Sequence, residues 1–144
     1  MLDIGRARSS LPYVSQIINV DGQPYLDGGI VDSIPVERAI AMGHEHNVLI
    51  LTRNRGYRNT SKDRKIPKFI YKNYPRLRVD LSRRIAEYNR QLELVEQMED
   101  RGEVTVIRPL RPMEVDRIEK DEKKLEALYE EGFQLGEEFC KLKV

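Results

Sequence analysis

An aspartate followed by two glycines is the part of this sequence best suited to chemistry. Asp27 ends an apolar-containing stretch, and Gly28 and Gly29 directly after it remove side-chain bulk and free the backbone to turn tightly. A carboxylate so placed can face a pocket at the end of a strand. The same triplet is also typical of a turn in which Asp27 only accepts hydrogen bonds from backbone amides. The triplet by itself leaves both interpretations open.

Two histidines flank a glutamate in the string His44-Glu45-His46, a composition that invites a metal interpretation. Alternate residues of a strand-like stretch point to opposite faces, and no third group of ligands is evident. We therefore expect a solvated corner between a helix and a strand, with no metal and no other cofactor.

Positive charge is concentrated in the middle of the chain. Residues 53–84 hold 12 basic and 2 acidic side chains, whereas the flanking pieces are both acidic. This segment could bind an anionic lipid surface or an acidic substrate, or pair with the acidic helices expected over residues 85–144, and nucleic acid is the least favoured partner. The candidate anion or lipid contacts are Arg55, Arg58, Lys62, Arg64 and Lys65.

The elements that must position Asp27 can be predicted from local patterns. Asp21-Gly22 between two apolar-containing runs predicts a β-hairpin over residues 16–26. Pro35 predicts the first turn of a helix that runs to about Met42 and stops at Gly43. The continuous apolar run of residues 48–51 then predicts a strand that is buried on both faces in a parallel sheet.

The rest of the chain is predicted to be mainly helical. We expect an exposed loop over residues 53–65 and a short helix within 66–74, followed by long amphipathic helices over 76–101 and 121–142 with a short strand at 104–107 between them. Gly132 and Gly136 favour close packing of the last helix against a neighbour. Strand, helix and strand in succession predict the α/β class.

A longer string around Asp27 resembles patatin-like phospholipases. It reads SSLPYVSQIINVDGQPYLDGGIVDSIPVERAIAMG, and the likeness covers at least residues 6–59. The matching features are Ser9, Ser10 and Pro12 of an S-S-x-P-type element, the hairpin, D-G-G, the proline that opens the next helix and the glycine that closes it. Arg8 departs from the small residue common in relatives.

The resemblance implies a lipid acyl hydrolase that cleaves acyl esters or phospholipids with a serine and aspartate dyad. Asp27 matches the dyad aspartate, which would orient or deprotonate the serine, and Gly28 and Gly29 match the motif glycines. The implied fold is an α/β/α layered sheet. Residues 1–144 would form the C-terminal portion of one such domain, with the catalytic-aspartate region at 1–59 and a helical region at 60–144.

The nucleophile of such a dyad is absent from these 144 residues. No serine lies in a G-x-S-x-G elbow, and no glycine-rich oxyanion loop is present, so the chain alone should be inactive. Because the likeness begins close to Met1, we expect the N-terminal part of the hydrolase to be missing. The alternative is a non-catalytic binding module that uses residues 53–84 to bind an anionic partner or nucleic acid.

Composition limits the remaining possibilities. Cys140 is the only cysteine, so an internal disulfide cannot form. The sequence has neither an apolar run long enough to span a membrane nor a signal-peptide pattern at its start, which predicts a cytoplasmic protein, at most peripheral at the inner membrane face. An incomplete fold would leave apolar surface uncovered, so we expect self-association or poor solubility of the chain alone.

Overall fold

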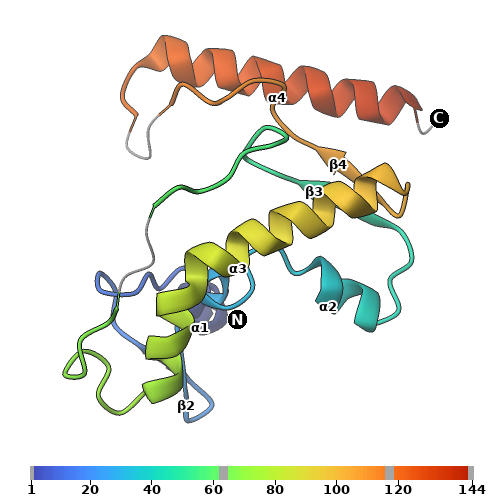
Figure 1. Ribbon diagram of the computed structural model, residues 1–144. Helices are drawn as coiled ribbons and strands as arrows, with labels where there is room; N and C mark the ends of the chain where they lie inside the picture. The colour runs from blue at the N-terminus through green and yellow to red at the C-terminus, as the bar shows by residue number, and fades with distance from the viewer. Residues whose placement is uncertain (1, 62–64, 116–118, 143–144) are drawn as a thin grey trace. The chain divides into compact units, whose positions relative to one another are not determined.

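The computed structural model describes residues 2–61, 65–115 and 119–142 and has mixed α and β structure, as the sequence predicts (Figure 1). The chain divides into two compact units. The first comprises Met1–Pro35 and Asn59–Gln91, and the second comprises Val36–Arg58 and Leu92–Val144. One long helix, α3 (Pro75–Asp100), contributes residues to both.

The first unit contains α1 (Leu2–Ala7), the predicted hairpin and a short 3-10 helix. Strands β1 (Ile18–Val20) and β2 (Gln23–Tyr25) pair antiparallel, with Val20 opposite Gln23. Asp21 and Gly22 join them with φ values of 51° and 77°, the left-handed pair that a tight two-residue hairpin turn requires. The prediction of a hairpin at this turn is confirmed.

The turn at Asp27 continues into the 3-10 helix η1 (Gly28–Ile30). The prediction of a short helix within residues 66–74 is wrong. These residues hold turns and no helix, and α3 begins directly after them at Pro75. The physical reason is Tyr71, whose φ of 51° is left-handed and cannot continue a right-handed helix.

The second unit is built around a two-stranded parallel sheet. It contains α2 (Val36–Ala41), β3 (Asn47–Ile50), the last part of α3, β4 (Val104–Ile107) and α4 (Glu122–Leu142). Strands β3 and β4 pair in parallel from Asn47 opposite Val104 to Ile50 opposite Ile107. The predicted helix after Pro35, the two predicted strands and the placement of the first of them in a parallel sheet are confirmed.

The expectation that this strand is buried on both faces is wrong. Leu49 is buried, but Val48 and Ile50 on the opposite face are 46% and 78% exposed. Side chains alternate between the two faces of a strand, so only one face of β3 is covered in this chain. The continuous apolar run indicated the strand correctly and overestimated its burial.

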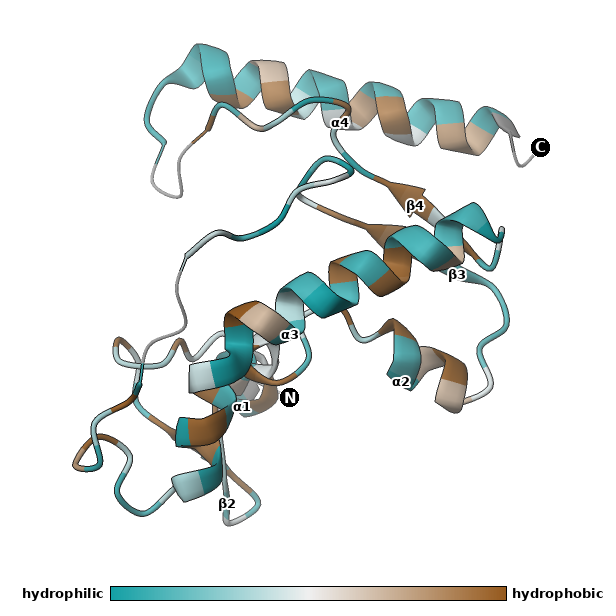
Figure 2. Ribbon diagram, viewed as in Figure 1, coloured by the Kyte–Doolittle hydropathy of each residue, from teal (hydrophilic) through white to brown (hydrophobic). Residues whose placement is uncertain are grey.

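The two long helices lie close to their predicted bounds. Helix α3 ends before Gly102, whose φ of 71° supports a left-handed terminating turn in which the amide of Glu103 donates to the Met98 carbonyl at 2.9 Å. Figure 2 shows hydrophobic residues recurring along both helices. None of the described helices is both long and apolar enough to cross a membrane.

The apolar side of α4 is largely uncovered. Leu125, Tyr129 and Phe133 are 44%, 66% and 53% exposed. A Cβ added to Gly132 or Gly136 would meet no atom within 4 Å. The close packing that this pair of glycines led us to expect is therefore not found within the described residues.

Candidate active site at the Asp27 turn

Asp27 caps the short helix η1 with its own side chain. Oδ1 of Asp27 accepts a hydrogen bond from the amide of Gly29 at 2.7 Å. The backbone of Asp27 is fixed as well, because its amide donates to the carbonyl of Ser10 at 3.0 Å and its carbonyl accepts from the amide of Ile30 at 3.2 Å. The hydrogen bond to Ser10 joins the S-S-x-P-type element to the D-G-G turn within the first unit.

The two motif glycines differ in what the turn requires of them. A Cβ on Gly29 would lie 3.0 Å from Oδ1 of Asp27, which is closer than such contacts normally come. A Cβ on Gly28 would meet nothing within 4 Å. The Asp27 carboxylate, which accepts from the Gly29 amide, thus occupies the space that a side chain at position 29 would need. At position 28 the structure gives no steric reason for glycine.

Two side chains of α3 hold the backbone that follows Asp27. Nε of Arg84 donates to the carbonyl of Gly29 at 3.1 Å. The buried Gln91 accepts with Oε1 from the amides of Ser33 and Ile34, both at 3.1 Å. Its Nε2 donates to Oδ1 of Asp32 at 2.6 Å. Residues 29–34 therefore depend on side chains of α3 for these hydrogen bonds.

Sequence reasoning missed Arg84 and Gln91. Both lie in the helical register that carries Tyr88 and Val95, since residues 84, 88, 91 and 95 follow each other at intervals of four, three and four. Polar side chains that interrupt an otherwise apolar stripe are a readable sign of buried hydrogen bonds. That sign could have identified Gln91 as a buried residue.

No serine hydroxyl in the described residues contacts the Asp27 carboxylate. The hydroxyls of Ser9, Ser10 and Ser33 donate to the backbone carbonyls of Gly5, Arg6 and Gly29 instead. These short-range bonds stabilise local turns. The geometry agrees with the absence of a nucleophile elbow from the sequence.

Two of the five candidate anion contacts already have acidic partners in the structure. Arg55 pairs with Glu99 and Asp100, and Arg58 pairs with Glu96 at 2.7 Å. Lys65 is exposed, whereas Lys62 and Arg64 lie outside the described residues. The two arginines thus have the intramolecular acidic partners that one of the alternatives predicted.

Glu96 is the centre of this pairing. The hydrogen bond from Arg58 lowers the pKa of Glu96, although partial burial opposes the shift, and the amide of Gly56 also donates to this carboxylate at 2.8 Å. The same hydrogen bond raises the pKa of Arg58. The buried Arg108, which follows β4, pairs with Glu99 and approaches Glu96 at 3.9 Å.

The histidine corner contains no assembled metal site. His44 and His46 are both exposed and lie in the turn between α2 and β3. Over residues 2–61, 65–115 and 119–142, no group of three or more histidine, cysteine, aspartate or glutamate side chains could hold a metal ion.

A family model matches the part of the chain from just before α3 to the end of α4. Residues 74–142 match a domain of unknown function (DUF6363). Neither a curated protein nor a solved structure matches the chain. The matched segment includes Arg84 and Gln91, whereas Asp27 lies outside it. The Asp27 turn is therefore held by side chains from the matched region.

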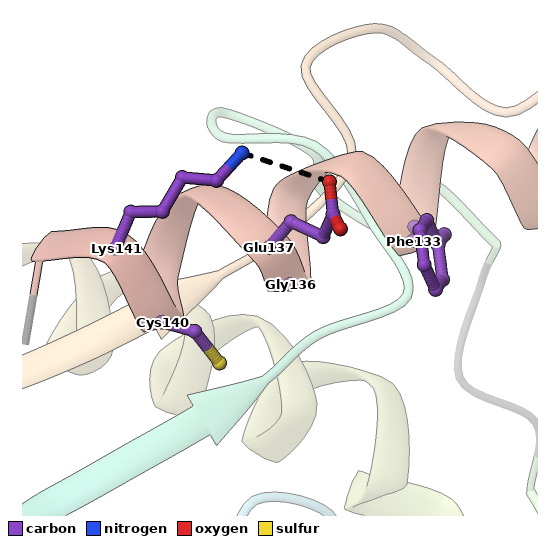
Figure 3. Close-up of a pocket in the computed structure, with 6 residues that line it drawn as sticks. Phe133, Gly136, Glu137, Cys140 and Lys141 are labelled. Atoms are coloured by element: carbon purple, nitrogen blue, oxygen red, sulfur yellow. Dashed lines mark ion pairs between the residues drawn. The ribbon is translucent and has the colours of Figure 1, made fainter.

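A hollow along α4 offers less chemistry than the Asp27 turn (Figure 3). All six residues that line it belong to this helix: Gly132, Phe133, Gly136, Glu137, Cys140 and Lys141. Its two charged groups pair with each other, with Nζ of Lys141 3.7 Å from Oε2 of Glu137. The Asp27 turn, with an oriented carboxylate, is the stronger candidate for a reaction site.

Proposed function

We propose that this chain is the C-terminal part of a patatin-like lipid acyl hydrolase and that Asp27 is the aspartate of its serine and aspartate dyad. The observation that carries the proposal is the 2.7 Å hydrogen bond from the Gly29 amide to Oδ1 of Asp27. This bond holds the carboxylate in one orientation. Oδ2 has no hydrogen-bond partner among the described residues, so it is available to a serine hydroxyl.

The chemistry assigned to Asp27 follows from its charge and its fixed position. A carboxylate can orient a serine hydroxyl and accept its proton as the hydroxyl attacks an ester carbonyl. The nucleophile and the donors for the developing oxyanion would come from a segment that these 144 residues do not contain. The proposed substrates are fatty-acyl esters, including phospholipids, and the proposed parent fold is an α/β/α layered sheet.

The rival proposal, a non-catalytic module that binds anions through residues 53–84, has less support. Arg55 and Arg58 are engaged by carboxylates of α3. An anionic partner would have to displace these ion pairs before it could contact either side chain. Any anion binding by this segment would depend on its other basic residues.

The test uses the protein expressed together with the upstream coding sequence, and compares Asp27→Asn with Asp21→Asn. Asparagine at position 27 keeps an oxygen that can accept from the Gly29 amide, so the turn should survive while the charge is lost. Asp21 is a matched control because it lies exposed in the hairpin turn with a φ of 51°, a conformation that asparagine adopts readily.

We expect Asp27→Asn to lower kcat for a short-chain aryl ester by roughly a thousandfold, and Asp21→Asn to leave it unchanged. The 144-residue chain alone should show no turnover above the uncatalysed rate. Equal turnover by wild type and Asp27→Asn would refute the dyad assignment. An upstream sequence without a G-x-S-x-G segment would favour the binding module.

A further inference from the structure

Two irregular segments of the first unit meet through a pair of tyrosines. The amide of Tyr13 donates to the hydroxyl of Tyr71 at 2.9 Å, and the two ring centroids lie 5.8 Å apart. Both residues have left-handed backbones, with φ values of 69° and 51°. Such a conformation is costly for a bulky side chain and persists where the surrounding contacts impose it. The tyrosine pair therefore fixes the segment around residue 13 beside the one around residue 71.

The most exposed large hydrophobic side chains of the described residues lie on these two segments. Val14 is 83% exposed and Phe69 is 80% exposed, and Tyr13 and Leu11 next to Val14 are 57% and 42% exposed. Hydrophobic and hydrophilic residues alternate along the loop that leads into α3 (Figure 2). A single exposed hydrophobic residue is ordinary, but a group held together by a specific contact needs an explanation.

The charged side chains in the segment around Phe69 are all basic. Residues 65–79 contain five basic side chains and no acidic one. Lys65, Lys68, Lys72 and Arg76 are all exposed, and within the described part of the chain none of them forms an ion pair. Arg55 and Arg58, in contrast, form ion pairs with carboxylates of α3. We call these four cations together with Leu11, Tyr13, Val14 and Phe69 the docking patch.

We propose that the docking patch binds the surface of an anionic lipid bilayer. Phe69 and Val14 enter the boundary between headgroups and acyl chains, and the cations contact lipid phosphates. The aliphatic Val14 and Leu11 suit acyl chains, whereas a nucleic-acid base could stack only on the rings of Tyr13 and Phe69. The proposal does not rest on the role of Asp27, since it predicts binding and no turnover.

The first experiment places a fluorescent reporter in the patch. The sequence contains no tryptophan, so Phe69→Trp introduces a single one. Leu110→Trp is the matched control, because Leu110 is 78% exposed and lies in the second unit. Vesicles of phosphatidylcholine with phosphatidylglycerol should shift the emission of Trp at position 69 to shorter wavelength and leave that at position 110 unchanged. Phosphatidylcholine alone should have a weak effect on both.

The second experiment measures the contribution of charge by vesicle co-sedimentation at low and high salt. Changing Lys65, Lys68 and Lys72 together to glutamine should lower the partition coefficient at low salt by on the order of a hundredfold and remove most of its salt dependence. A variant with Lys120, Lys123 and Lys141 changed to glutamine loses the same charge elsewhere and should bind like wild type. Phe69→Ser should weaken binding about tenfold, and Leu110→Ser should not.

Several outcomes would overturn the proposal. These are an absence of binding to anionic vesicles at low salt, equal spectral shifts at positions 69 and 110, and equal losses in the two lysine variants. Tighter binding to a single-stranded oligonucleotide than to vesicles, abolished by Phe69→Ser, would assign the patch to nucleic acid instead. Because Phe69 and the three lysines of the patch are exposed, circular dichroism of each variant should match that of wild type.

Discussion

At the scale of single residues, one arrangement of atoms at the Asp27 turn is compatible with two roles. The hydrogen bond from Gly29 to Asp27 is the one expected of an ordinary capped turn, and in the proposed dyad the same bond would orient the reactive carboxylate. Local geometry is the same in both cases. The substitution Asp27→Asn distinguishes the two roles. It keeps an oxygen that accepts the hydrogen bond from the Gly29 amide and removes the carboxylate that would accept a proton from serine.

Gln91 should be important for stability through its buried hydrogen bonds. Gln91→Ala leaves the amides of Ser33 and Ile34 without their acceptor, and the free energy of unfolding should fall by roughly 2 kcal/mol. The measurement is urea denaturation followed by circular dichroism. Gln97→Ala is the control, since Gln97 is exposed on the same helix and should change stability little. A similar loss in both variants would show that the hydrogen bonds of Gln91 contribute nothing specific.

At the scale of elements, α3 acts as a scaffold for irregular backbone. In the first unit Asn89 accepts from the amide of Asn59 at 2.8 Å and donates to its carbonyl at 3.0 Å, much as a strand partner would. In the second unit Glu96 accepts from the amide of Gly56. Polar side chains of a helix thereby satisfy backbone groups of segments that belong to no sheet.

The ion pair between Arg58 and Glu96 predicts a particular dependence of stability on pH. The pKa of Glu96 is lowered in the folded chain, so its contribution is fully present above the 4.5 typical of an unfolded glutamate. That contribution should be lost as the pH falls through the lower value of the folded state. Glu96→Gln should be less stable than wild type at neutral pH by on the order of 1 kcal/mol, and the difference should shrink on acidification.

Urea denaturation at neutral pH and near pH 3, at one protein concentration, tests this linkage. Glu126→Gln provides the control, because Glu126 is exposed on α4 and has no recorded ion pair among the described residues. If the difference between wild type and Glu96→Gln were the same at both pH values, the lowered pKa would not be the source of the stabilisation.

At the scale of the whole molecule, exposed hydrophobic side chains outnumber buried ones. Among the described residues ten hydrophobic side chains are buried and seventeen large ones are exposed. The exposed set includes one face of β3 and much of the apolar side of α4. Burial of such surface is favourable at about 25 cal/mol per Å², which provides a driving force for association.

We therefore predict that the 144-residue chain self-associates at high concentration. Sedimentation velocity over a concentration series should show a rising average mass, and Ile50→Lys together with Phe133→Lys should reduce it, because both side chains are exposed on apolar faces. Leu110→Lys adds charge at an equally exposed site outside β3 and α4 and should have a smaller effect. A stable monomer at all concentrations would contradict the prediction.

The sequence alone determined the features that depend on neighbouring residues. Asp21-Gly22 specified the hairpin turn, Gly102 the end of α3 and the period of apolar residues the two long helices. These choices follow from backbone conformational preferences and from the period of the helix, which act over a few residues. The helix predicted within residues 66–74 does not form, because Tyr71 has a left-handed backbone and contacts Tyr13, which lies 58 residues away in the sequence.

Burial and charge pairing were decided only by the tertiary structure. Gln91 is buried because it binds backbone amides 57 and 58 residues away, and Arg58 is neutralised by a carboxylate 38 residues away. The apolar run of β3 could not reveal that one of its faces is uncovered, since burial depends on which other elements are present. A local pattern can indicate that a residue such as Gln91 is buried, but the partner of each hydrogen bond and ion pair, and the faces that are covered, depend on segments distant in the sequence.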